Sequence, residues 1–298
     1  MTIDDLLAPP PPPPPPPAHR ADDHDGAPID EPGPRPIPWP KQYGRTARAF
    51  RSIGGAFALA LDVIRLSFKR PVQWREFVEQ LWFVASVSIL PAALVSIPFG
   101  AVIALQLGTL TVQLGAQSFT GAAAVLAVVQ QASPIVVALM IAGAAGTAIC
   151  ADLGARTIRE EIDAMSVLGV SPVHRLIVPR VWACVLVAVF LNGMVSVVGV
   201  AGGYVFNVLV QGGTPGAYLS SFSSLAQISD LYVGEIKAVV FGFLAAVVAS
   251  YRGLHPRPGP KGVGDAVNES VVITFVLLFL VNLGITTLYL RIVPSKIT

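Results

Sequence analysis

The chain has 298 residues, of which 53% are hydrophobic and 13% are charged, and its mean hydropathy is +0.66. Soluble domains carry about 25% charged residues, and the apolar residues here come in long blocks instead of an amphipathic period. We therefore predict an integral membrane protein. The formal net charge of +2 is too small to indicate a nucleic-acid partner. Cys150 and Cys184 lie in or near apolar segments without zinc or redox spacing, which indicates small packing residues.

Residues 1–43 differ in composition from the rest of the chain. An unbroken proline run from Pro9 to Pro17 is followed by a polar stretch that contains further prolines. So little apolar surface cannot offset the entropy of ordering, so we predict a disordered, proline-rich cytoplasmic tail. It is either a solvated extension or a docking site for a proline-binding partner. We expect no cleavable signal peptide, because a basic segment followed by a short apolar one is missing.

Residues 45–69 have the pattern of a basic amphipathic helix. The residues of its apolar face recur at steps of three or four, and they are Phe50, Ile53, Phe57, Leu61, Ile64 and Phe68. The cations lie largely off that face, and they are Arg45, Arg48, Arg65 and Lys69. We predict an interfacial helix in the plane of the lipid headgroups that ends at Pro71. The alternative is a cytosolic helix packed on the rest of the protein.

Five apolar segments are long enough to cross the membrane, which takes about 20 residues. They are residues 81–107, 121–151, 181–210, 231–251 and 270–290. The fold class predicted is an all-α integral membrane protein with an N-terminal interfacial helix and five transmembrane helices. Residues 211–230 are expected to form a loop. Among the charged residues in the spans, Glu235 and Lys237 alone have a candidate partner, which is each other, and we place both near the outer surface.

The basic residues predict the orientation. Of the 20 Lys and Arg residues, only Lys237, Arg291 and Lys296 lie outside three regions: the N-terminal region, residues 156–180 and residues 252–261. Basic segments next to spans stay in the cytoplasm, and these three regions alternate with two nearly charge-free links. We expect a multi-pass protein of the inner (plasma) membrane, with its N-terminus cytoplasmic and its C-terminus extracytoplasmic.

Residues 143–180 form a charged island between two spans. If residues 155–168 are helical, Ile158, Ile162 and Met165 share one face and an acidic cluster lies beside two arginines. Gly169 and Pro172 then stop the helix. A short cytoplasmic helix of this kind can act as a knob for a soluble partner. A solvated loop with ordinary ion pairs remains an equal alternative.

No catalytic or metal-binding constellation is evident in the sequence. The phosphate-binding pattern GxxxxGK[ST] is absent, so we expect no ATP hydrolysis by this chain, no cofactor and no enzyme activity of its own. A secondary transporter driven by ions usually carries ionisable groups or broken helices at the midplane, which we do not find. A passive anchor for an extracytoplasmic complex would fit the spans but would leave the acidic cluster unexplained.

Long motifs resemble those of one family. They are AGAAGTAICADLGARTIREEIDAM from residue 142, PVHRLIVPRVWA from residue 172, QWREF at 73–77, VSIPFGAVIALQLG at 95–108 and PKGVGDAVNESVV at 260–272. Together they resemble the MlaE/YrbE permeases, specifically the A-type YrbE proteins that accompany Mce proteins in mycobacteria and related actinobacteria. The resemblance covers residues 44–298, which we expect to form the permease domain, and it does not extend to the proline-rich tail.

The resemblance implies the permease subunit of an ATP-driven Mce lipid importer. It implies a heterodimer with a B-type YrbE paralogue, a cytoplasmic ABC ATPase dimer that binds ATP and Mg, and six Mce proteins outside. The implied coupling helix contains Arg159, Glu160, Glu161, Ile162, Asp163 and Met165. The implied lipid pathway lies on the first span at Ile97, Phe99, Val102, Leu105 and Gln106. Fatty or mycolic acids are the first expectation for the cargo, and sterols are the second.

Overall fold

The computed structural model describes residues 45–69, 73–115, 120–210, 212–225 and 228–292. Within these residues the secondary structure is entirely helical. The predicted tail, residues 1–43, lies outside the described residues.

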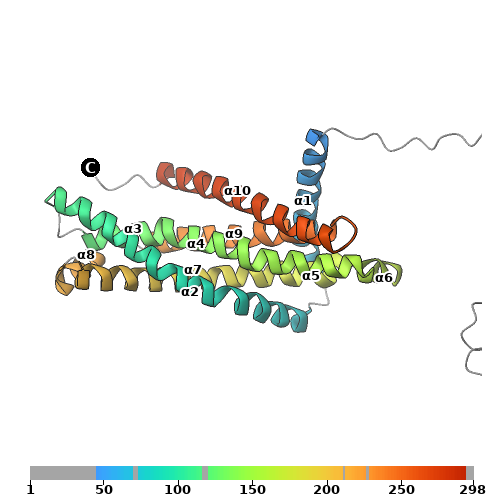
Figure 1. Cartoon of the computed structure of the whole chain (residues 1–298), viewed down its shortest axis with the longest axis horizontal. Helices are drawn as coiled ribbons and strands as arrows, with labels where there is room; N and C mark the ends of the chain where they lie inside the picture. Colours follow the sequence, from blue (N-terminus) through green and yellow to red (C-terminus); the bar gives the residue numbers. More distant parts are fainter. Residues whose placement is uncertain (1–44, 70–72, 116–119, 211, 226–227, 293–298) are drawn as a thin grey trace, which may run out of the picture. The chain divides into compact units, whose positions relative to one another are not determined.

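Five helical segments are long and apolar enough to span a membrane, which confirms the predicted number (Figure 1). The first is α2 (Trp74–Gln113). The third is π-helix η5 (Val173–Ile177) with α7 (Val178–Val210), and the fourth and fifth are α9 (Ile228–Leu254) and α10 (Pro260–Ile292). Each is longer than the apolar segment predicted, because the helices continue through the polar residues at their ends.

The second span is one helix of five consecutive segments. These are α3 (Thr120–Ala127), η3 (Val128–Ala132), α4 (Ser133–Met140), η4 (Ile141–Ala145) and α5 (Gly146–Ile158). Proline lacks an N–H and its ring clashes with the carbonyl four residues earlier, which for Pro134 is the carbonyl of Gln130. The wider π-turn at η3 relieves that clash. The same reasoning applies to η5, since Pro179 stands four residues after Arg175.

Helices α2 and α7 pack closely along a stripe of small residues. The buried residues of α2 recur at every fourth position, and they are Gln80, Val84, Ser88, Ala92, Ser96, Gly100, Ala104 and Gly108. A Cβ atom at Gly100 would collide with the carbonyl of Gly199 on α7, and one at Gly202 would lie 3.1 Å from the carbonyl oxygen of Ile97. Small residues of this kind let two membrane helices approach through their backbones. The other faces of α2 are left largely exposed.

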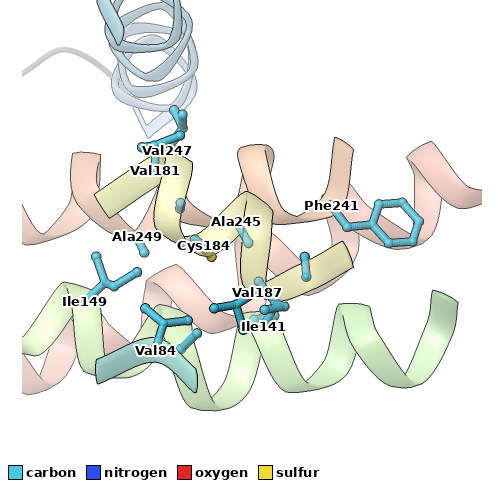
Figure 2. Close-up of a cluster of buried hydrophobic side chains, with 14 of the residues drawn as sticks. Val84, Ile141, Ile149, Val181, Cys184, Val187, Phe241, Ala245, Val247 and Ala249 are labelled. Atoms are coloured by element: carbon cyan, nitrogen blue, oxygen red, sulfur yellow. The ribbon is translucent and has the colours of Figure 1, made fainter. Parts of the chain in front are cut away.

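The hydrophobic core lies among the second, third and fourth spans, with α2 at its side (Figure 2). Ile141, Ile149, Cys184 and Phe241 are fully buried there. Cys150 and Cys184 are both free and buried, in agreement with their expected role as packing residues.

Helix α1 (Arg45–Ser67) runs across the direction of the spans (Figure 1). It packs through Leu59 and Val63, which are buried. The described residues of its predicted apolar face are all exposed, and they are Ile53, Phe57, Leu61, Ile64 and Phe68. A helix that contacts the protein on one side and exposes a separate apolar stripe fits an interfacial position. The side chains of Phe50, Arg45 and Arg48 lie outside the described residues.

A further helix was missed by the sequence reasoning. Residues 215–225, expected as part of a loop, form α8 (Pro215–Leu225), which packs against α3. Figure 1 shows α8 at the opposite end of the bundle from α6 (Glu161–Val167).

Candidate functional site

The charged island does not form one continuous helix, so the expectation of a helix over residues 155–168 is wrong. Helix α5 ends at Ile158 and α6 begins at Glu161. Glu160, between them, has a φ of 60° in the left-handed region. That conformation costs a residue with a side chain about 1 to 2 kcal/mol, so the surrounding contacts must hold it. Arg159 and Glu160 therefore belong to a turn, and α6 has seven residues.

The end of α6 follows the prediction. Gly169 has a φ of 75°, and its N–H donates to the Ser166 carbonyl at 3.1 Å. The N–H of Val170 donates to the Met165 carbonyl at 3.0 Å. This is the Schellman arrangement, in which a glycine in the left-handed region ends a helix and satisfies its last carbonyls.

The predicted coupling residues are not one free acidic surface. Glu161 forms an ion pair with Arg159, in which Oε1 lies 3.0 Å from Nε, and its Oε2 lies 3.9 Å from Nη1 of Arg156. Glu160 and Asp163 are exposed, whereas Ile162 and Met165 are only partly buried. The island thus presents two acidic side chains to solvent, and a third that is paired with arginines.

Two apolar residues at the end of α6 were missed by the sequence reasoning. Val167 is 87% exposed and Leu168 is 78% exposed. Adjacent exposed apolar side chains at the tip of a polar loop are typical of a contact surface for another protein. They were missed because the periodicity assigned the apolar face to Ile158, Ile162 and Met165.

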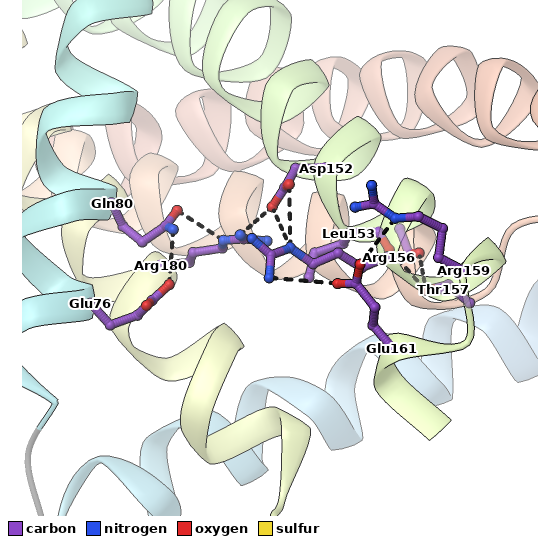
Figure 3. Close-up of polar contacts among 10 residues, drawn as sticks. Glu76, Gln80, Asp152, Leu153, Arg156, Thr157, Arg159, Glu161 and Arg180 are labelled. Carbon is purple, nitrogen blue, oxygen red and sulfur yellow. Dashed lines mark hydrogen bonds and ion pairs between the residues drawn. The ribbon is translucent and has the colours of Figure 1, made fainter. Parts of the chain in front are cut away.

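A polar network behind α6 ties the island to the spans (Figure 3). Arg180, at the start of α7, forms an ion pair with Asp152 of α5 and donates from Nε to Gln80 Oε1 of α2 at 2.9 Å. Arg156 Nε donates to the same Asp152 carboxylate at 3.2 Å. Gln80 Nε2 in turn donates to Glu76 Oε1 at 3.1 Å. Since Arg156 also faces Glu161, the contacts run from α6 through α5 and α7 to α2.

The centre of this network is buried. Arg180 is only 1% exposed, and a guanidinium taken out of water must be paired and hydrogen-bonded. Asp152 and Gln80 supply partners for two of its nitrogens, Nη2 and Nε, whereas Nη1 is buried without a hydrogen-bond partner among the described residues. Sequence reasoning could not find these contacts, because Asp152 and Arg180 lie on different helices and Gln80 comes from a third.

The predicted lipid-pathway residues all lie on exposed parts of α2. The exposed fractions are 50% for Ile97, 40% for Phe99, 56% for Val102 and 46% for Leu105, and Gln106 is exposed as well. They lie off the stripe that packs against α7. A separate apolar groove of about 320 Å³ lies nearer the start of α2, lined by residues that include Leu81, Ile89 and Met194. None of the five predicted residues lines that groove.

Lys237 and Glu235 do not pair with each other, contrary to the partnership considered from the sequence. Lys237, 1% exposed, donates from Nζ to the backbone carbonyl of Gln130 at 3.0 Å and to Thr286 Oγ1 at 2.9 Å. Glu235 instead accepts from Asn192 Nδ2 at 3.1 Å. The carbonyl four residues before Pro134 is therefore an acceptor for a buried ammonium group.

Within the described ranges, no group of three or more His, Cys, Asp or Glu side chains could hold a metal ion. An all-helical protein with five spans, an interfacial helix and a polar loop that ion pairs hold between its second and third spans has the architecture of a membrane permease subunit. The family model described as Permease MlaE matches residues 77–288. The chain belongs to the MlaE permease family.

Relatives from distant organisms agree with this assignment. A probable ABC transporter permease protein of Rickettsia bellii is 31% identical over 83% of this chain and 96% of its own length. The intermembrane phospholipid transport system permease protein MlaE of Haemophilus influenzae is 29% identical over 65% of this chain and 75% of its own. The chloroplastic protein TRIGALACTOSYLDIACYLGLYCEROL 1 of Arabidopsis thaliana is 28% identical over 78% of this chain and 67% of its own.

Proposed function

We propose that this chain is the permease subunit of an ATP-driven lipid transporter, and that α6 is its contact with a separate ATPase. The observation that carries the proposal is the exposed, apolar tip of α6 joined to a buried ion network that reaches α2. A loop with no partner would gain nothing from exposing Val167 and Leu168, and it would not need a buried arginine behind it.

The coupling surface comprises Arg159, Glu160, Glu161, Ile162, Asp163 and Met165, with Val167 and Leu168 added from their exposure. Glu160 and Asp163 are exposed and give this surface negative charge, which a basic groove on the ATPase would complement. Displacement of α6 by the ATPase moves α5 through the chain. The Asp152–Arg180–Gln80 contacts then carry the displacement to α7 and α2.

The lipid pathway in this proposal follows the exposed side of α2, where Ile97, Phe99, Val102, Leu105 and Gln106 lie. A second permease subunit facing this side would enclose an apolar route. Such a route is required, because moving a sixteen-carbon chain through water would cost on the order of 13 kcal/mol at about 0.8 kcal/mol per methylene. ATP, bound with Mg at the partner ATPase, would supply the energy that resets the route.

The finer assignment rests on the resemblance of the motifs to YrbE proteins. We propose an A-type YrbE subunit of an Mce complex, paired with a B-type paralogue and supporting six Mce proteins. Its cargo would be fatty acids, mycolic acids or sterols. The orientation proposed has the N-terminus and α6 in the cytoplasm and the C-terminus outside, in accordance with the positions of the basic residues.

The substitution Leu168→Asp tests the contact between α6 and the ATPase. A carboxylate placed in an apolar interface must be desolvated without a partner, so we expect at least a tenfold loss of co-purifying ATPase from detergent-solubilised membranes. Leu114→Asp is the matched control, because Leu114 is 79% exposed at the other end of α2 from Trp74. Equal ATPase recovery with Leu168→Asp and with the unchanged chain would contradict the assignment of α6.

A further inference from the structure

An apolar cleft lies where the end of α1, the start of α2 and the start of α7 meet. Its volume is about 210 Å³, below the range of about 300 to 1,000 Å³ typical of pockets that enclose a whole small molecule. Leu66, Phe77 and Val178 contribute apolar walls, and the indoles of Trp74 and Trp182 border it. The cleft therefore has room for part of a larger, apolar molecule.

The two tryptophans place this cleft at the boundary between hydrocarbon and water. Trp74 is 68% exposed and Trp182 is 42% exposed, and tryptophan rings gather at the headgroup level of membranes. Trp182 Nε1 donates to Ser67 Oγ at 2.7 Å, which fixes its ring against the end of α1. The cleft also lies beside the interfacial helix, whose exposed apolar stripe marks the same level.

The polar residues around the cleft have complementary roles. Lys69 and His174 line it, and no carboxylate is among the described residues that do. The side-chain oxygen Oε1 of Gln73 is buried and has no hydrogen-bond partner within the described part of the chain. A buried acceptor left without a donor is unfavourable, so a small rotation of the Gln73 side chain toward a ligand hydroxyl in the cleft would be stabilising.

We propose that this cleft binds one anionic phospholipid of the phosphatidylglycerol class. Its phosphate lies at Lys69, a glycerol hydroxyl of its headgroup donates to Gln73 Oε1, and the upper part of one acyl chain packs between Trp74 and Trp182. A zwitterionic choline lipid satisfies fewer of these groups, because its headgroup has no hydroxyl donor and carries a cation toward Lys69. The lipid would tie α1 to α2 and α7 at the membrane surface.

Quenching by brominated lipids tests this site in the full chain. In a Trp39→Phe/Trp82→Phe background, the remaining tryptophans are Trp74 and Trp182, both at the cleft. The protein is reconstituted in phosphatidylcholine bilayers that contain equal fractions of either brominated phosphatidylglycerol or brominated phosphatidylcholine. We expect stronger quenching by the brominated phosphatidylglycerol.

Two variants and one control separate a specific site from general surface charge. Lys69→Gln should lower the preference for phosphatidylglycerol over phosphatidylcholine about fivefold, because one cation near a membrane surface strengthens the binding of anionic lipid by about that factor. Gln73→Leu should lower it too, since the acceptor is lost while the apolar walls remain. Arg65→Gln removes an exposed cation of α1 that does not line the cleft, and it should leave the preference unchanged.

Three results would overturn the proposal. Equal quenching by the two brominated lipids would mean that the cleft takes any acyl chain. Retention of the full preference in Lys69→Gln would remove the cation from the site. Equal loss in Lys69→Gln and Arg65→Gln would show that only the overall surface charge attracts the lipid.

Discussion

Removing the carboxylate of Asp152 should destabilise the permease far more than removing its second arginine. The Asp152→Ala substitution leaves the guanidinium of Arg180 buried and without its countercharge, while Gln80 remains as a neutral partner. Breaking a buried ion pair from one side costs about 3 to 5 kcal/mol. Because the Asp152 side chain is 34% exposed, water reaches the site, and we expect about 3 kcal/mol.

Two further variants calibrate that value. Arg156→Ala removes a side chain that is 31% exposed and leaves the Asp152–Arg180 pair intact, so its cost should stay below about 1 kcal/mol. The double variant Asp152→Leu/Arg180→Met replaces the pair by apolar groups. Its free energy of unfolding should lie within about 1 kcal/mol of that of the unchanged chain, because apolar replacement of a buried pair is often neutral.

The two buried thiols provide the assay. Cys150 and Cys184 are inaccessible in the folded chain, so a fluorogenic maleimide reports unfolding on heating in detergent. For a chain of this size, about 3 kcal/mol corresponds to a fall of about 6 to 12 °C in melting temperature. If Asp152→Ala melts together with Arg156→Ala, or if the double variant is as labile as Asp152→Ala, the buried pair does not hold the island to the spans.

Three other results are expected. Gly100→Val should destabilise by about 1 to 3 kcal/mol in the thiol assay, because its side chain meets the α7 backbone. Gly143→Ala, with open space around it, should not destabilise, and equal stability of the two variants would contradict the close packing. Val102→Asp should lower lipid uptake at matched membrane levels more than Val276→Asp, which has a similar exposed fraction (56% against 53%), and equal uptake would remove α2 from the pathway. A topology reporter inserted at Gly169 should be cytoplasmic and one fused after the last residue extracytoplasmic; the same side for both would contradict the orientation.

The spans could be predicted because hydropathy acts over about 20 residues, and no competing signal is as strong. The island was harder. Its helix end at Gly169 was predicted, since glycine is the residue that takes a left-handed conformation at little cost. The break at Glu160 was not, because a glutamate with a φ of 60° has no sequence signal of its own. Contacts across the turn accompany it, because Glu161 of α6 pairs with Arg159 in the turn and lies near Arg156 of α5.

The buried network could not be predicted for a related reason. Periodicity reports which residues share a face of one helix, whereas Gln80, Asp152 and Arg180 come from three helices. Arg180 was therefore read only as a basic residue that fixes orientation. Its burial follows from the packing of α2 on α7, where Gln80 is the first member of the stripe that otherwise consists mainly of small residues.

These two features attach α2 to the rest of the chain in two different ways. Along most of its length it is held by small side chains, which let the backbones of α2 and α7 approach closely. At the end near Trp74 it is held by Gln80 and its buried partner Arg180, a directional contact to the part of the chain that carries α6. Pro91 and Pro98 interrupt its hydrogen-bond ladder within the region held by small residues, and both lie at exposed positions. On the proposed mechanism, a pull from α6 would therefore act at one end of α2 and bend it at the prolines, which changes the exposed face at Val102 without breaking the core.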